Sequence, residues 1–221
     1  MSQTGPVLYL DMDAGSIEGT LLKDRSGYRN NGTVSGATPT SSGKINGALS
    51  FNGIDDYVQV SDSASLRPAQ FTVSSWIKIN AYPAVLGSIL RKECVPSWRN
   101  NYAFSLDATK LNAVSCDNVG NSVIVSKVLN VGQWYFVTLT YNGSVLTLYV
   151  DGTYVGVSAA FTLYVYTTSN LLIGSYFTAG VDRYPFGGII DEVRIWSRAL
   201  SASEIKSEFI KSEKQVGRLA G

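Results

Sequence analysis

Apolar and polar residues alternate along much of the chain, and Gly, Asn, Asp and Ser interrupt this alternation at short intervals. A period of two is typical of a β-strand that buries one face, because successive side chains point to opposite sides of a sheet. Many short strands separated by turn residues indicate antiparallel pairing in a sandwich or barrel. The pattern therefore predicts an all-β fold.

The segment from Gln133 to Val157 has the clearest alternation, and it contains the turn dipeptides Asn142-Gly143 and Asp151-Gly152. Both dipeptides favour two-residue type I′ turns, whose central residues need positive φ. Two such turns bring the large aliphatic side chains to one face, and a slip of one residue would invert that face. We therefore expect a three-stranded antiparallel meander. The expected cross-strand pairs are Tyr141/Ser144, Leu139/Leu146, Val137/Leu148, Val150/Thr153, Leu148/Val155 and Leu146/Val157.

One helix is indicated near the C-terminus. Ser201 and Glu204 have the spacing of a capping box, and Leu200 and Ile205 have the spacing of a hydrophobic staple. We expect one short C-terminal helix there. Residues 211–221 lack such a pattern and are expected to form a tail, which leaves residues 1–210 as a single domain.

Composition narrows the range of functions. The 221 residues are 45% apolar and 16% charged, which is ordinary for a globular protein. The net charge is +1, and basic residues form no stripe apart from spaced lysines in the predicted helix, so nucleic acid is not favoured as a partner. No apolar run approaches the roughly 20 residues of a membrane span, so membrane insertion is not expected.

Two further absences in the sequence concern targeting and catalytic chemistry. The first residues, MSQTGPVLYLD, lack the basic and apolar regions of a signal peptide; either a signal has been removed or the protein is not exported by that route. The sequence contains no histidine, which excludes Ser-His and Cys-His nucleophile pairs and His-ligated zinc. Two cysteines are too few for a thiolate metal site.

Longer motifs follow one another in order along the chain. They are LYLDMDAG, KDRSGYRNNGTVSG, FNGIDDYVQVSDSASL, FTVSSWIKI, GQWYFVTLTYNGSVLTLYVDGTYVG, LLIGSY and GGIIDEVRIWSRALSASEI. From Val7 to Phe209, this series resembles the laminin-G-like, concanavalin A-like lectin/glucanase superfamily. The resemblance implies a two-sheet antiparallel jelly-roll sandwich with one concave sheet. It does not define one function, since such domains bind glycans, bind proteins or build adhesins and virion fibres, and some are glycosidases.

The resemblance also implies a structural calcium ion at the edge of the sandwich. By motif, its ligands would be Asp13, the carbonyl of Gly53, and Asp191. Calcium takes six to eight oxygen ligands, and a mixed carboxylate and carbonyl set suits it. The alternative is that the aspartates only cap turns. Further candidate ligands are Asp11, Asn52, Asp55 and Asp56, where Asn52 replaces an aspartate that relatives usually carry.

Catalysis is not expected. Glucanases of this superfamily carry Glu-x-Asp-x-Glu on one strand, and the motif does not occur here. Asp11 and Asp13 have a spacing of two but lie where the metal is expected, and Asp191 and Glu192 are adjacent, so they point to opposite faces of a strand. A glycoside hydrolase with a non-standard carboxylate pair is kept as an alternative.

The implied fold places Cys94 and Cys116 on strands in the same region of one sheet. One interpretation is a Cys94–Cys116 disulfide at the base of the loop CVPSWRNN, and the other is two separate buried thiols. The chain-entropy model gives such a bridge a stabilisation of about 3 kcal/mol.

Two polar and aromatic clusters are candidate ligand sites. Sugars are recognised by aromatic faces together with planar amide and guanidinium hydrogen bonds. Trp76, Trp134 and Trp196 lie in family motifs and are interpreted as packing residues, whereas Trp98 is outside them, with the alternative that it packs against its own loop. The first cluster is Trp98, Arg99, Asn100, Asn101 and Tyr102, and the second, expected across the concave face, is Tyr176, Asp182, Arg183 and Tyr184.

The leading hypothesis is a non-catalytic, lectin-like carbohydrate-binding module with a structural calcium ion. Its expected partner is a glycan or glycoprotein surface, and its expected location is extracellular, on a cell surface or on a virion. The main alternative is a structural or adhesion domain that makes protein–protein contacts in an oligomer or larger assembly. Thirteen tyrosines and a low charge content suit the exposed adhesive surface of such a domain.

Overall fold

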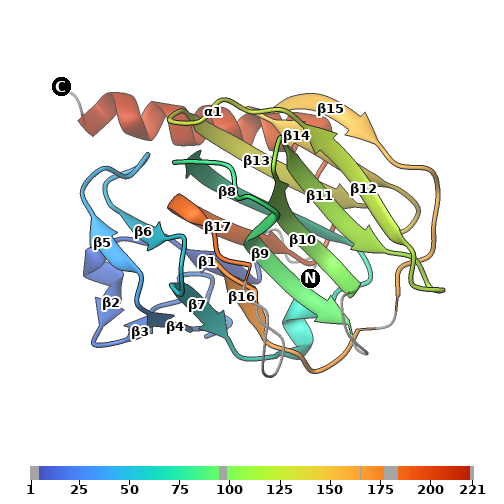
Figure 1. Ribbon diagram of the computed structural model, residues 1–221, viewed down its shortest axis with the longest axis horizontal. Coiled ribbons are helices and arrows are strands. Elements are labelled where there is room, and N and C mark those ends of the chain that lie inside the picture. The colour runs from blue at the N-terminus through green and yellow to red at the C-terminus, as the bar shows by residue number, and fades with distance from the viewer. Residues whose placement is uncertain (1–4, 95–98, 165, 177–183, 220–221) are drawn as a thin grey trace.

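The chain folds into two stacked antiparallel β-sheets with one α-helix against them (Figure 1). The computed structural model describes residues 5–94, 99–164, 166–176 and 184–219, except for the side chains of residues 94, 99 and 217–219. The predicted two-sheet antiparallel sandwich is confirmed. In Figure 1 the helix α1 runs along the top of the sandwich.

The first sheet lies next to the helix, and its central strands are β8 and β17. Its strands, in spatial order, are β15 (Thr153–Val157), β14 (Leu146–Val150), β13 (Trp134–Tyr141), β8 (Phe71–Ile79), β17 (Gly187–Trp196), β6 (Ala48–Asn52) and β5 (Thr38–Thr40), with β1 (Leu8–Leu10) also paired to β17.

The second sheet is formed largely by the middle of the chain and by short strands near the N-terminus. Its strands, in spatial order, are β12 (Ser122–Lys127), β11 (Leu111–Cys116), β10 (Arg99–Asp107), β9 (Leu86–Cys94), β16 (Leu171–Ile173), β7 (Tyr57–Val60), β4 (Gly32–Ser35), β3 (Leu21–Leu22) and β2 (Ile17–Glu18). Two 3-10 turns, Ala14–Ser16 and Ala64–Leu66, join strands.

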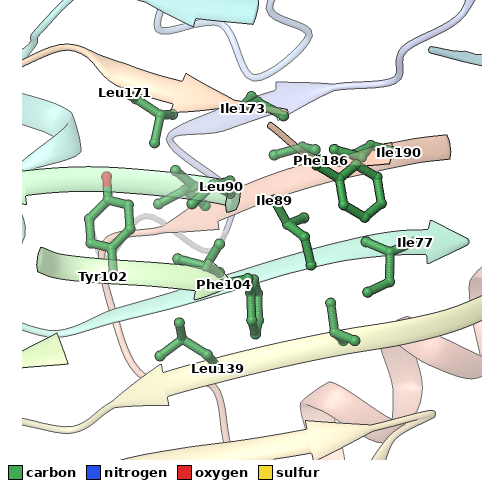
Figure 2. Close-up of a cluster of buried hydrophobic side chains, with 14 of the residues drawn as sticks. Ile77, Ile89, Leu90, Tyr102, Phe104, Leu139, Leu171, Ile173, Phe186 and Ile190 are labelled. Carbon is green, nitrogen blue, oxygen red and sulfur yellow. The ribbon is translucent and has the colours of Figure 1, made fainter. Parts of the chain in front are cut away.

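The core lies between the sheets (Figure 2). Ile77 and Leu139 of the first sheet point toward Leu90 and Phe104 of the second, and all four side chains are fully buried. Each large apolar side chain removed from water in this way contributes about 1.5–3 kcal/mol before conformational entropy is counted. This layer fixes which strand positions face inward, and the remaining positions form the outer faces.

The hairpin between β13 and β14 differs from the predicted register by two residues. Tyr141 pairs with Leu146 rather than with Ser144, so the connection contains four residues, 142–145. The side chain of Asn142 accepts hydrogen bonds from the backbone N–H groups of Ser144 and Val145, each at 3.0 Å, and so closes a longer turn. Because the shift is two residues, every side chain keeps its predicted face.

The hairpin between β14 and β15 has the predicted two-residue turn. Val150 pairs with Thr153, and Asp151 and Gly152 both have positive φ, at 53° and 66°. Beyond Tyr149 a bulge shifts the register, so Leu148 lies opposite Gly156 rather than Val155. The predicted pairs beyond the bulge were therefore wrong by one residue.

Helix α1 (Ala202–Leu219) starts as the sequence predicts but is longer. The Ser201 N–H donates to Glu204 Oε2 at 2.8 Å and the Glu204 N–H donates to Ser201 Oγ at 3.3 Å, which confirms the capping box. Leu200 and Ile205 are buried in one cluster with Trp196, which confirms the staple. Among the described residues, no helix has the length and apolarity to cross a membrane.

The tail predicted for residues 211–221 is wrong for residues 211–219, which continue the helix. Tertiary contacts explain the difference. Phe209 packs on Trp76 and Phe136, with ring centroids 5.8 and 6.2 Å apart, and Glu213 forms an ion pair with Lys44 at 2.7 Å. These partners are distant in the sequence, so the tail itself carries no signal of them.

Candidate functional site

A β-bulge at Ile89 determines which side chains of β9 face outward. Phe104 of β10 pairs with Leu90, but the next residue of β10 pairs with Ser88, so Ile89 is the extra residue. An inserted residue interrupts the alternation of faces. Ile89 and Leu90 both enter the core, and Ser88 and Arg91 come to the outer face.

A second bulge, at Asn101, determines which side chains of β10 face outward. Asn100 pairs with Glu93 and Tyr102 with Lys92, so Asn101 is the extra residue. Its carbonyl accepts a hydrogen bond from Ser115 Oγ at 2.8 Å, and its amide Nδ2 donates to the Tyr164 carbonyl at 2.8 Å. Because of this bulge, Asn100 shares the outer face with Ala103 rather than alternating away from it.

The two bulges open onto one pocket on the outer face of the second sheet. The cavity has a volume of about 220 Å³. It is lined by Leu86, Ser88, Arg91, Asn100, Ala103, Ser105, Asn112, Val114, Ser122, Ile124 and Tyr184, which come from β9 to β12 and from the segment before β17. Hydroxyl, amide, guanidinium and apolar groups therefore converge on a single hollow, which we call the outer-face pocket.

Tyr184 lines one wall of the outer-face pocket and stacks on Tyr176 behind it. The rings of Tyr176 and Tyr184 are nearly parallel, with centroids 5.8 Å apart and an interplanar angle of 7°, and the guanidinium carbon of Arg91 lies 3.6 Å from the centre of the Tyr176 ring. Burial raises the pKa of Tyr176, and hydrogen bonding to Glu93 adds to the effect. Tyr176 is fully buried, whereas Tyr184 is half-buried and lines the pocket. Arg91 thus packs on Tyr176, and Tyr176 in turn supports the half-buried ring of Tyr184.

Ser88 and Asn100 each have a buried polar atom in the pocket without a hydrogen-bond partner in the part of the chain that the structure describes. These atoms are Ser88 Oγ and Asn100 Oδ1. Leaving a buried polar group unpaired costs about 1–3 kcal/mol, and most such groups in native proteins are paired. By contrast, Asn112 donates to Asp107 Oδ2 at 3.1 Å and accepts from Ser126 Oγ at 2.6 Å. Ser88 and Asn100 are therefore the groups of this pocket that are ready to bond a polar ligand.

The structure brings only part of the two predicted ligand clusters together. Asn100 of the first cluster and Tyr184 of the second line the same pocket. Tyr176 does not line the pocket, but it stacks against Tyr184. Trp98, Asp182 and Arg183 lie outside the described residues, as does the side chain of Arg99.

The prediction that Asn101 and Tyr102 belong to a binding loop was wrong. Strand β10 already begins at Arg99, so these residues are strand residues with defined faces. Both are fully buried. The Tyr102 hydroxyl donates to the Leu66 carbonyl at 3.0 Å, and its ring lies 5.1 Å from that of Phe71, which places it in the core.

The sequence prediction missed Ser88, Arg91 and Asn112. Each lies within an ordinary strand motif, and its outward position depends on strand pairing and, for the first two, on the Ile89 bulge. The packing interpretation is confirmed for Trp76 and Trp196, which are buried, whereas Trp134 is partly exposed.

Two of the three predicted metal ligands lie close together. The backbone N–H groups of Lys44 and Ile45 donate to Asp191 Oδ2, each at 2.9 Å, and the Gly47 N–H donates to Asp13 Oδ1 at 2.7 Å. One short loop therefore holds both carboxylates. Burial, with the charges of Glu192 and Asp13, raises the pKa of Asp191 to about 8. Asp191 Oδ1 is buried and has no hydrogen-bond partner among the described residues.

The third predicted ligand, Gly53, does not join this acidic pair. Ile190 pairs with Leu49, so Asp191 lies near the Ala48 end of β6, whereas Gly53 follows the opposite end. Five residues of strand correspond to about 16 Å. Gly53 has a φ of 74° and lies in the turn before β7. Its positive φ, rather than a ligand role, explains why glycine is at this position.

The additional candidate ligands are engaged in other contacts. Asn52 Oδ1 accepts from the backbone N–H of Ile54 at 2.7 Å, and Asp56 Oδ2 accepts from the Asn52 N–H at 2.8 Å, as expected of turn caps. Asn52 Nδ2 donates to Asp55 Oδ1, and Asp11 pairs with Arg25 at 3.0 Å. Among the described residues, no group of three or more Asp, Glu, Cys or His side chains is arranged to hold a metal.

The strand order does not favour the Cys94–Cys116 disulfide. Cys94 ends β9 and Cys116 ends β11, and β10 lies between these strands. Two strand spacings amount to about 9.6 Å, whereas the Cα atoms of a disulfide lie less than about 7 Å apart. Cys116 is buried, and its Sγ accepts a hydrogen bond from the Asn100 N–H at 3.2 Å, while the side chain of Cys94 lies outside the described set.

Residues 52–206 match the family described as the concanavalin A-like lectin/glucanases superfamily. This match covers most of the chain, and the chain belongs to this family. No curated protein matches the sequence.

Solved structures with the same fold include three that are informative. The binding domain of Paraclostridial Mosquitocidal Protein 1 is 19% identical with a TM-score of 0.74, and the match covers 93% of this chain and 52% of that one. The receptor binding domain of botulinum neurotoxin D is 16% identical with a TM-score of 0.69, over 94% and 52%. Trypanosoma rangeli sialidase is 18% identical with a TM-score of 0.74, over 96% and 34%. The chain thus spans about half of each toxin domain and a third of the sialidase.

Proposed function

We propose that the chain is a carbohydrate-binding module and that its ligand occupies the outer-face pocket. The observation that carries the proposal is that Ser88 Oγ and Asn100 Oδ1, in a pocket also lined by Tyr184, are buried and have no hydrogen-bond partner among the described residues. A sugar presents hydroxyl groups and a C–H face, and small-ligand pockets combine a few fixed polar groups with aromatic surface in this way. Ser88 pairs with Ser105 and Asn100 pairs with Glu93, so the two atoms lie about four strand positions apart, and different hydroxyl groups of one saccharide would bond them.

The lining of the pocket supports binding without hydrolysis. Glycosidases need two carboxyl groups, about 5–10 Å apart, on either side of the scissile bond. The described residues that line the pocket are Ser, Asn, Arg, Tyr and apolar side chains, with no carboxylate among them. We therefore propose a non-catalytic role.

The likeness to toxin domains supports a surface partner. A receptor binding domain and a toxin binding domain share this fold, although identities of 16% and 19% support the fold alone. We propose a glycan or glycoprotein as the partner, and an extracellular or surface location as the place where the chain meets it.

We also propose that Asp13 and Asp191 hold a structural calcium ion. The fit rests on Asp191 Oδ1, a buried carboxylate oxygen for which the described residues provide no hydrogen-bond partner, and on the neighbouring charge of Asp13. A divalent cation would neutralise the two carboxylates and tie β17 to the loop of residues 43–47. Gly53 does not fit as a ligand, so carbonyl groups or water must supply the remaining oxygens that calcium needs.

A glycan array with the intact chain tests the binding proposal, followed by calorimetry on two matched variants. Ser88→Ala removes the unpartnered hydroxyl in the pocket, and we expect at least tenfold weaker saccharide binding. Its melting temperature should be unchanged or higher, because a buried unpaired group is removed. Ser74→Ala is the control, since Ser74 Oγ is equally buried and has no hydrogen-bond partner in the described part of the chain, but it lies on β8 of the first sheet and does not line the pocket.

The two variants give a clear contrast. Both should be as stable as the unmodified chain, and only Ser88→Ala should lose affinity. If no glycan binds on a broad array, or if Ser88→Ala binds its glycan as tightly as Ser74→Ala, the proposed site is wrong.

A further inference from the structure

A second cavity lies close to the outer-face pocket, at the rim of the sandwich. It has a volume of about 440 Å³, and its walls come from the end of β6, the loop after β8 and the segment that leads into β17. The argument uses Gly53, Asn80, Ala81, Tyr82, Pro83 and Pro185 of this lining. We call this cavity the rim pocket.

The two pockets are separated by one narrow ridge. Tyr184 lines the outer-face pocket and the next residue, Pro185, lines the rim pocket. On the facing segment, Leu86 lines the first and Pro83 lines the second. Three residues span at most about 10 Å, so the two pockets are neighbours.

The ridge is tightly packed. The Ser88 N–H donates to the Tyr184 carbonyl at 2.9 Å, which joins its two segments. At Gly87, a Cβ atom would lie 3.0 Å from the Pro185 carbonyl oxygen and 3.2 Å from Pro83 Cγ, so glycine permits this close approach. A ligand that occupies both pockets therefore crosses a closely packed, rigid part of the protein surface.

The rim pocket has chemistry similar to that of the outer-face pocket. The Tyr82 hydroxyl donates to the Leu129 carbonyl at 2.8 Å and accepts from the Leu129 N–H at 3.1 Å, which fixes the half-buried ring. Pro83 and Pro185 add rigid apolar surface, and the exposed Asn80 adds a carboxamide. A fixed aromatic ring, rigid apolar faces and an amide form a surface suited to a sugar rather than to an ion.

We infer that the rim pocket is a second subsite of the same ligand site, and that the ligand is an oligosaccharide chain whose units occupy both pockets across the ridge. This inference rests on the proposed carbohydrate-binding function. Two linked subsites act together because the second contact becomes intramolecular once the first has formed. Affinity should therefore depend on chain length.

The test is isothermal titration calorimetry of the intact chain with graded probes. The probes are methyl glycosides of glucose, galactose and N-acetylglucosamine and their β-linked oligosaccharides of two to six units. For the series that binds, Kd should fall at least tenfold between one unit and the length that spans the ridge, and then stay level.

Two tryptophan substitutions show whether the rim pocket provides the gain in affinity for longer probes. Ala81 is exposed and lines the rim pocket, so Ala81→Trp should fill the cavity without disturbing the fold. We expect it to reduce the affinity for the longest probe to that of the methyl glycoside, whose own Kd should not change. Ala160→Trp is the control, because Ala160 is exposed and lines neither pocket, and its chain-length dependence should match the unmodified chain.

The possible outcomes distinguish this inference from the proposed carbohydrate-binding function on which it rests. A methyl glycoside that binds and loses affinity in Ser88→Ala, with no further gain for longer probes, would overturn the second subsite and keep the carbohydrate site. A full chain-length gain in Ala81→Trp would also overturn it. Absence of binding to every saccharide on a broad array would remove the proposed function and this inference together.

Discussion

The outer faces of the two sheets differ in what lies against them. On the first sheet, α1 covers the face, with Phe209 on Trp76 and Phe136, and Lys44 extending from a distant loop to Glu213. On the second sheet, the corresponding face carries the outer-face pocket with its polar lining. The chain itself therefore covers the outer face of the first sheet, whereas the outer face of the second sheet carries polar groups that line a pocket.

Within the described residues, both faces contain buried polar atoms that have no hydrogen-bond partner, and the two faces differ in whether a cavity reaches those atoms. Ser74 Oγ and Thr138 Oγ1 lie on the covered face, and Ser88 Oγ and Asn100 Oδ1 on the open one. An unpaired atom under a helix only lowers stability, because no ligand reaches it. The same atom in a cavity can contribute to binding. A buried polar atom without a partner therefore indicates a binding site only where it also lines a cavity.

Removing the aromatic contact under the helix should have the largest effect on stability. Trp76 is 1% exposed and contacts Phe136 and Phe209, so Trp76→Ala should lower the free energy of unfolding by about 3–5 kcal/mol. Urea denaturation measures this loss. Saccharide affinity at a temperature where the variant is folded should not change. A loss below about 1 kcal/mol would mean that the helix does not cover this face as described.

Calcium bound at the proposed site, Asp13 and Asp191, should have the next largest effect on stability. At a free concentration 100 times Kd, calcium should stabilise the chain by about 2.7 kcal/mol, measured by calorimetry with and without EDTA. Asp191→Asn should lose this response. Asp55→Asn is the matched control, because Asp55 is an exposed turn residue, and it should keep the full response. An equal response in all three proteins, or none in the unmodified chain, would contradict the proposed ion site.

On the open face, the ring of Tyr184 should contribute to affinity rather than to folding. Tyr184→Ala should weaken saccharide binding about tenfold, or about 1.4 kcal/mol, because the exposed end of the stack is lost. Tyr184→Phe keeps the ring and should bind within about twofold of the unmodified chain. Calorimetric titration of both variants measures this. Equal affinity in Tyr184→Ala would show that the stack supports the fold alone.

The smallest effect is expected at the ion pair between the helix and the loop of residues 43–47. Lys44 and Glu213 are partly exposed, so Glu213→Gln should cost only about 0.2–1 kcal/mol of stability. The loss should shrink in high salt, which thermal melts at two ionic strengths would show. A loss of several kcal/mol in the free energy of unfolding would contradict this account, because a partly exposed ion pair contributes little to stability.

Local signals in the sequence predicted the elements well. The capping box at Ser201 and the Asp151-Gly152 turn depend on residues close together in the chain, and both are present. The Asn142-Gly143 turn was predicted too short, because the Asn142 side chain closes a four-residue connection as readily as the dipeptide closes a two-residue one. The face pattern survived this error because the slip was even.

The site was only partly predictable, because it depends on non-local pairing. The extra residues Ile89 and Asn101 look like ordinary strand residues, and only the pairing of β9 with β10 shows that they are bulges. Those bulges decide that Asn100 faces the pocket and that Tyr102 faces the core. Polar and aromatic composition identified the right region, but it could not assign faces within it.

Mapping backbone amide shifts by NMR during titration with an array-selected glycan tests the central claim most directly. The outer-face pocket predicts that the largest shifts cluster at Ser88, Asn100 and Ser105, with α1 and the covered face of β8 unaffected. Shifts that centre on α1 or the outer face of the first sheet, with the pocket amides unchanged, would contradict it.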